Sequence, residues 1–140
     1  MKAFATRMEI QARIDTIWAL LLDLPNWARW NTTIDRTVGQ IGRGARIQVF
    51  VKQSPGRAFP LRVTELDAPH RMVWAGGMPL GLFKGTRVYE LEPRAGGSTE
   101  FRMREGYTGL LAGLIEKSIP DLQPSFDEFA RCLKRAAEGR

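Results

Sequence analysis

The spacing of apolar residues changes from that of a strand to that of a helix near the start of the chain. In "KAFATRMEIQA", residues 2–12, Phe4 and Ile10 fall on the same face of an alternating segment, which predicts a first strand. In "RIDTIWALLLDL", residues 13–24, apolar residues including Trp18 recur every three to four positions. This spacing predicts a short amphipathic helix.

A second short helix and a series of strands are predicted next. Asp23 is a cap-like residue and Pro25 lies in the following turn, so a helix is expected through "LPNWARW". The later pattern is strand-like, interrupted by turn-forming Gly, Pro and Asp. It predicts antiparallel strands near 34–40, 44–52, 58–67, 70–76, 82–92 and 98–108.

The last two of these strands place two charges on an apolar face. Successive side chains of a strand point to opposite faces, so the face that carries Tyr89 and Met103 also carries Arg87 and Glu105. If the intervening turn is centred on Gly96, Arg87 lies opposite Glu105. We therefore expect a cross-strand ion pair on the inner face of the sheet.

Helical spacing returns from Leu110 to the end of the chain, where Phe126 and Phe129 are part of the apolar stripe. Pro120 and Pro124 are expected to kink or divide this helix. The order of elements predicts an α+β fold: a sheet of about seven antiparallel strands around a long C-terminal helix, with two short helices after the first strand. We expect residues 1–140 to form a single domain.

Composition restricts the setting and the chemistry. The chain is 44% hydrophobic and 26% charged, with no apolar run long enough to span a bilayer and no signal-peptide pattern, which predicts a cytoplasmic protein. Cys132 is the only cysteine and His70 the only histidine. We therefore expect no internal disulfide, no metal site built on thiolates or histidines, and no cofactor.

The net charge of +6 and the pI near 10.1 raise the question of nucleic-acid binding. However, the arginines are scattered along the chain, usually beside Asp or Glu, and no basic run or basic helix concentrates them. The sequence therefore favours a solvated basic surface over a nucleic-acid interface.

Several segments together resemble a known family. They are "IQARIDTIWALLLDLPNWARWN", "VTELDAPHRMVWAGG", "FKGTRVYELEPRAGGSTEFRMREGYTG" and "FARCLKRAAE". The sequence resembles the START-like superfamily (SRPBCC), in particular its polyketide cyclase/dehydrase branch, nearly from end to end. The resemblance implies a helix-grip fold with a hydrophobic cavity between the sheet and the C-terminal helix. One departure concerns that cavity, because the family often has histidine where this chain has Arg87.

The resemblance and the alternation of faces together give a set of candidate site residues. Candidate ligand-binding residues are Arg87, Tyr89, Phe101, Met103, Tyr107, Trp30, Trp74 and Phe83. Glu105 is the candidate catalytic residue. The leading interpretation is binding or carriage of a small hydrophobic or aromatic molecule.

Two other functions remain open at this stage. One is a cyclase/dehydrase-type enzyme in which Glu105 is the acid or base and Arg87 orients substrate oxygens. The other is a protein-interaction module without a ligand, and a homodimer is possible in any of these cases. A purely structural role for the pair formed by Arg87 and Glu105 is also open.

Overall fold

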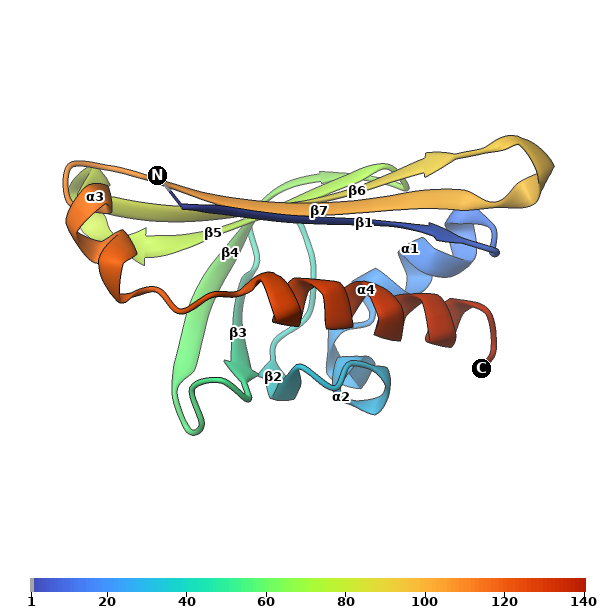
Figure 1. Ribbon diagram of the computed structural model, residues 1–140, viewed down its shortest axis with the longest axis horizontal. Helices are drawn as coiled ribbons and strands as arrows, with labels where there is room; N and C mark the ends of the chain where they lie inside the picture. The colour runs from blue at the N-terminus through green and yellow to red at the C-terminus, as the bar shows by residue number, and fades with distance from the viewer. Residues whose placement is uncertain (1) are drawn as a thin grey trace.

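The computed structural model describes residues 2–140 and contains one curled sheet with a long helix along its concave side (Figure 1). The strands are β1 (Ala3–Ile10), β2 (Ile34–Val38), β3 (Arg46–Val51), β4 (Ala58–Asp67), β5 (Arg71–Met78), β6 (Phe83–Pro93) and β7 (Thr99–Thr108). The helices are α1 (Ile14–Leu22), α2 (Trp27–Trp30), α3 (Ala112–Ile115) and α4 (Gln123–Ala137). Four 3-10 turns complete the order, η1 (Leu24–Asn26), η2 (Pro79–Gly81), η3 (Ala95–Gly97) and η4 (Glu116–Ser118).

The sheet has the strand order β1-β7-β6-β5-β4-β3-β2, and all of its pairings are antiparallel. The connection through α1 and α2 joins the two edge strands, so it crosses the concave side of the sheet. The predicted α+β class, the strand number and the helix-grip arrangement are confirmed. Strand boundaries differ from the predicted ones by a few residues, as at β2, which ends at Val38.

Irregular pairings accompany the curl of the sheet. The register of β4 against β5 shifts between Val63 and Glu65, and that of β2 against β3 shifts between Ile34 and Arg36. Such bulges bend the strand that carries them and increase its twist. Figure 1 shows β2, β3 and β4 turned away from the plane of β1, β7 and β6.

The core lies between α4 and the sheet. Phe126, Phe129, Ala130 and Leu133 recur at helical spacing and are buried toward the strands. The helix α1 packs against α4 and β6 and adds three buried residues to the core, Ile17, Trp18 and Leu21. Within residues 2–140, no helix is both long and apolar enough to cross a membrane.

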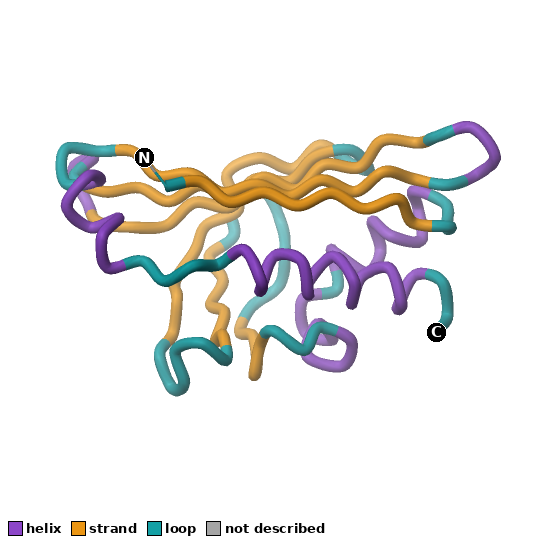
Figure 2. Tube along the Cα trace, in the orientation of Figure 1, coloured by secondary structure: helices purple, strands orange, loops and turns teal. Residues whose placement is uncertain are grey.

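Prolines divide the predicted C-terminal helix. Pro120 lies in the loop between η4 and α4, and Pro124 lies in the first turn of α4, where its missing amide donor costs no helical hydrogen bond. Figure 2 shows this break as a loop between two helical segments. The divided helix leaves the short α3 free to sit at the end of the sheet.

The predicted cap at Asp23 has a different partner from the one expected. Its carboxylate accepts a hydrogen bond of 2.7 Å from the side-chain amide of Asn26 and makes no side-chain bond to the backbone of η1. The second short helix nevertheless forms at the predicted place, as η1 followed by α2.

Glu138 anchors the C-terminal end of α4 to the rest of the fold. Its Oε2 accepts hydrogen bonds of 2.7 Å from Lys134 Nζ and from the Gln11 amide, and Arg140 donates to Oε1. The pKa of Glu138 is lowered from 4.5 to about 2, chiefly by the Lys134 hydrogen bond and then by that of the Gln11 amide. The ionised Glu138 carboxylate therefore stabilises the folded protein fully above about pH 4.5, and this contribution is lost as the pH falls toward 2.

We expect Glu138→Gln to lower the free energy of unfolding at neutral pH by about 1 kcal/mol, a value reduced by the solvent around the helix end. Urea unfolding of the wild type and the variant at a series of pH values measures this. The two stability curves should converge as the pH falls from 4.5 to 2. The exposed Asp35 on β2 provides the control Asp35→Asn. Parallel curves for the wild type and Glu138→Gln would contradict the assignment.

Candidate ligand-binding cavity

A cavity of about 670 Å³ lies between the concave face of the sheet and the first turns of α4. Side chains from β2 to β7, from α2 and its following loop, and from residues 115–129 line it. Most of these side chains are apolar or aromatic, among them Trp27, Val49, Trp74, Phe83, Met103, Ile119, Phe126 and Phe129. The curl of the sheet and the break before α4 together leave this volume unfilled.

Solvent-exposed lining residues mark where the cavity opens. They come from the hairpin between β3 and β4, from the end of β5 and from the segment before α4. Examples are Gln53, Arg57, Met78, Ser118 and Pro120. A ligand would therefore enter between the β3–β4 hairpin and the loop that precedes α4.

Arg87 and Glu105 form the ion pair that the sequence predicts. The two residues are register partners on β6 and β7, and Arg87 Nε donates to Glu105 Oε1 at 2.8 Å. The hydroxyl of Tyr107 donates to the other carboxylate oxygen, Oε2. Both oxygens of Glu105 thus accept a hydrogen bond from a neighbour on the same face of the sheet.

The pair faces the cavity rather than the outer solvent. Both side chains line it, and they keep 27% and 14% of their surface accessible for Arg87 and Glu105 respectively. The guanidinium carbon of Arg87 lies 4.7 Å from the ring centre of Phe126, within cation–π distance. Burial disfavours the charge of Arg87, but the nearby carboxylate of Glu105 outweighs this, so the pKa of Arg87 is raised. Arg87 therefore stays charged in the cavity.

The neighbouring tyrosines stay neutral. Burial, followed by the charge of Glu105, raises the pKa of Tyr107 well above 10. Burial also raises the pKa of Tyr89 to about 12, against the opposing effect of Arg87. Both hydroxyls are therefore hydrogen-bond donors at neutral pH.

Gly85 has no side chain, which leaves room for the Tyr107 ring in the cavity wall. The two residues are register partners, and a Cβ atom at Gly85 would lie 3.3 Å from the Tyr107 ring. Phe83 stacks on Tyr107 with ring centres 5.7 Å apart. A side chain at Gly85 would push this ring, and with it the hydroxyl that holds Glu105.

The structure brings most of the predicted site residues to the cavity. Its lining includes Glu105, Arg87, Met103, Tyr107, Trp74 and Phe83. The other three, Tyr89, Phe101 and Trp30, pack beside it against Phe129, with ring centres 6.1, 5.9 and 5.6 Å away. They support the wall from behind.

Several lining residues have no distinguishing pattern in the sequence. Asn31 and Arg57 lie in loops, and Ser125 lies at the start of α4. Phe126 and Phe129 do follow from the apolar stripe of the C-terminal helix, but only as core residues. The side of the helix on which the cavity opens depends on the curl of the sheet.

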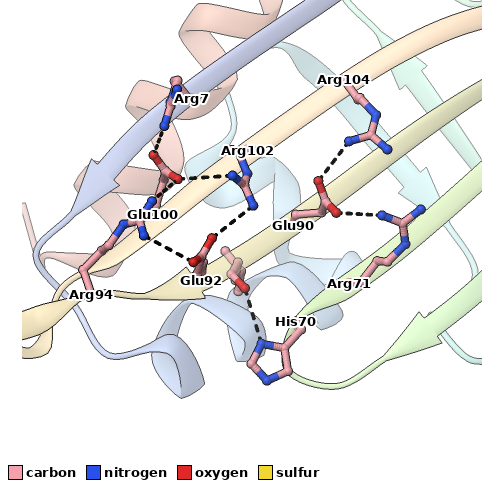
Figure 3. Close-up of polar contacts among 10 residues, drawn as sticks. Arg7, His70, Arg71, Glu90, Glu92, Arg94, Glu100, Arg102 and Arg104 are labelled. Carbon is pink, nitrogen blue, oxygen red and sulfur yellow. Dashed lines mark hydrogen bonds and ion pairs between the residues drawn. The ribbon is translucent and has the colours of Figure 1, made fainter.

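The outer face of the sheet is covered by ion pairs (Figure 3). Glu90 accepts from Arg71 Nη1 at 2.6 Å and from Arg104 Nη1 at 3.0 Å. A second group joins Glu92 and Glu100 to arginines of the neighbouring strands, namely Arg7, Arg94 and Arg102. Much of the positive charge on this face is therefore paired with carboxylates. Among residues 2–140, no group of three or more His, Cys, Asp or Glu side chains is placed to hold a metal ion.

Known structures share this fold at low sequence identity. A hypothetical protein, jhp0584, of Helicobacter pylori has a TM-score of 0.78 and 13% identity, over 97% of this chain and 88% of its own. A START superfamily protein from Mycobacterium smegmatis has a TM-score of 0.72 and 14% identity, over 98% and 97%. The di-domain ARO/CYC BexL from the BE-7585A biosynthetic pathway has a TM-score of 0.72 and 16% identity, over 99% of this chain and 47% of its own.

The sequence itself identifies the family. No curated protein matches it. A family model described as polyketide cyclase/dehydrase and lipid transport matches residues 1–138, nearly the whole length. The chain therefore belongs to this polyketide cyclase/dehydrase and lipid transport family.

Proposed function

We propose that the protein binds and carries a small hydrophobic or aromatic molecule in the cavity between the sheet and α4. The observation that carries this proposal is the cavity itself, about 670 Å³ of mostly apolar and aromatic wall with one polar cluster. Volumes of about 300–1,000 Å³ with a few convergent polar groups are typical of small-molecule sites. An interaction module would need neither this volume nor the buried charges.

The family supports the same class of ligand. Its description includes lipid transport as well as cyclase and dehydrase activities, and members of one fold can differ in function. We infer a carrier that works in the cytoplasm, where a buried, unpaired thiol such as Cys132 remains reduced.

Carriage is favoured over catalysis by the geometry around Glu105. Its two oxygens already accept hydrogen bonds from Arg87 and Tyr107. A general acid or base must lie within hydrogen-bond reach of the proton that it transfers, and both Glu105 oxygens are directed at protein donors instead. We therefore assign Glu105 to positioning Arg87. Turnover that Glu105→Gln abolishes while binding stays intact would instead establish the enzyme.

A thermal-shift screen tests the proposed function. Fatty acids, aromatic polyketides, flavonoids and sterols are the probes, and a DNA duplex is the control. A ligand of the folded state at about 100 times its Kd adds roughly 2.7 kcal/mol of stability, which raises the Tm by about 8 °C or more. No shift with any small molecule, or a shift with DNA alone, would contradict the proposal.

A further inference from the structure

Three buried hydrogen-bond donors near the cavity have no partner among residues 2–140. They are Trp74 Nε1, Asn31 Nδ2 and the hydroxyl of Tyr89. A neighbouring indole shows the contrast, because Trp27 Nε1 donates to the Leu21 carbonyl at 3.1 Å. Buried polar groups are nearly always hydrogen-bonded, and unsatisfied ones are costly. The described part of the chain therefore supplies no acceptor for these three donors.

Two of the three donors, Trp74 and Asn31, belong to the cavity wall, and Tyr89 packs directly behind Trp74. Trp74 is the register partner of Arg87 on the adjacent strand, and the rings of Trp74 and Tyr89 lie 5.0 Å apart. Trp27 stacks on Trp74 with ring centres 5.2 Å apart. Asn31 follows Trp27 by one helical turn, and its backbone amide donates to the Trp27 carbonyl at 2.8 Å. Trp74 and Tyr89 are therefore direct neighbours, and Asn31 lines the same cavity.

The orientation of Asn31 is fixed by its other side-chain atom. Its Oδ1 accepts from the Thr33 amide at 3.0 Å and from the Thr33 hydroxyl at 2.6 Å. The Nδ2 group is consequently the half of the amide that remains available. Trp74 and Asn31 both line the cavity, and both are about 1% exposed.

The charges of the cavity wall have an excess of one positive unit. Its charged lining residues are Arg57, which is exposed at the mouth, and the pair Arg87 and Glu105 inside, so positive side chains outnumber carboxylates by one. Arg87 donates to Glu105 through Nε, and the Tyr89 hydroxyl is its other polar neighbour. A guanidinium carries five N–H donors, so donors remain for a ligand in the cavity.

We infer that the cavity selects an amphipathic organic acid, whose carboxylate accepts from Arg87 and Trp74 while its aliphatic or aromatic part fills the apolar volume toward the mouth. This inference rests on the proposed function and names its ligand class. An oxygen-rich group would supply the acceptor that these donors lack, and a guanidinium binds a planar carboxylate more strongly than a neutral carbonyl. One excess positive charge matches a monocarboxylate.

Matched pairs of probes test this inference by isothermal titration calorimetry at neutral pH. Dodecanoate is compared with its methyl ester, and a naphthoate with its methyl ester, so that each pair shares one apolar body. The acids are expected to bind about tenfold more tightly than the esters, because a hydrogen bond to a charged group contributes about that factor.

Two variants locate the preference. Arg87→Met/Glu105→Met removes both charges together and should bring acid and ester within about twofold, since the charged donor is lost. Glu105→Gln keeps Arg87 but removes the carboxylate that competes with the ligand. It should tighten acid binding several-fold relative to ester binding. Circular dichroism verifies that each variant is folded, and Glu105→Gln tests the inference even if the double variant does not fold.

The outcomes separate the inference from the proposed function. Esters that bind the wild type as tightly as the acids would overturn the acid preference and leave hydrophobic carriage in place. Binding of neither member of either pair would overturn both. Acid binding that is unchanged or weaker in Glu105→Gln would overturn the assignment of Arg87 as the carboxylate donor.

Discussion

Replacing Ser125 by phenylalanine should reduce ligand affinity by about a hundredfold while leaving the protein folded. Ser125 is half-buried in the first turn of α4, lines the cavity and lies one helical turn before Phe129 on the same face. A phenyl ring at this position would occupy volume that the ligand needs. It would also bury apolar surface, so the free energy of unfolding should rise by about 1 kcal/mol.

The matched control places the same ring on the other side of the same helix. Arg131 is exposed, and its ion pair with Glu128 is of the surface kind that contributes little. Arg131→Phe should therefore bind the ligand as the wild type does. Calorimetric titration of the three proteins with one probe makes the comparison. Wild-type affinity in Ser125→Phe would mean that the ligand binds elsewhere.

Removing Arg87 alone should destabilise the protein more than removing Arg87 and Glu105 together. Arg87→Met leaves the Glu105 carboxylate in a mostly enclosed wall with Tyr107 as its remaining donor. Breaking a buried pair in this way costs about 3–5 kcal/mol, and solvent inside the cavity places this case near 3 kcal/mol. The double variant Arg87→Met/Glu105→Met should recover most of that loss.

Urea unfolding of the wild type, Arg87→Met, Glu105→Met and the double variant gives the coupling energy between the two positions. We expect a coupling of at least about 1 kcal/mol. Glu105→Met should cost less than Arg87→Met, because Arg87 keeps its contact with the Phe126 ring. Additive effects of the two single substitutions would show that the pair contributes nothing to folding.

The ion pair could be predicted from the sequence because it depends only on local rules. Alternation of faces and a turn centred on Gly96 are sufficient to place Arg87 opposite Glu105. The division of the C-terminal helix was predictable for the same reason, since Pro120 cannot continue a helix. Both conclusions need only the conformational limits of single residues.

The shape of the cavity could not be predicted in this way. It depends on how far the sheet curls, and the register shift between Val63 and Glu65 has no distinct sequence pattern. Tyr89 and Phe101 therefore looked like cavity residues from their alternation, although they pack behind the wall against Phe129. The free donors of Trp74 and Asn31 are equally hidden, because they follow from three-dimensional packing.

The central claim is that a ligand occupies the volume between the sheet and α4. The most direct test is a titration of the isotope-labelled protein with dodecanoate, followed by amide NMR spectra. The account predicts chemical-shift changes concentrated at Met103, Glu105 and Ser125, with the β6–β7 turn (Ala95–Gly97) unchanged. Changes confined to the outer face of the sheet, or no changes at saturating ligand, would contradict it.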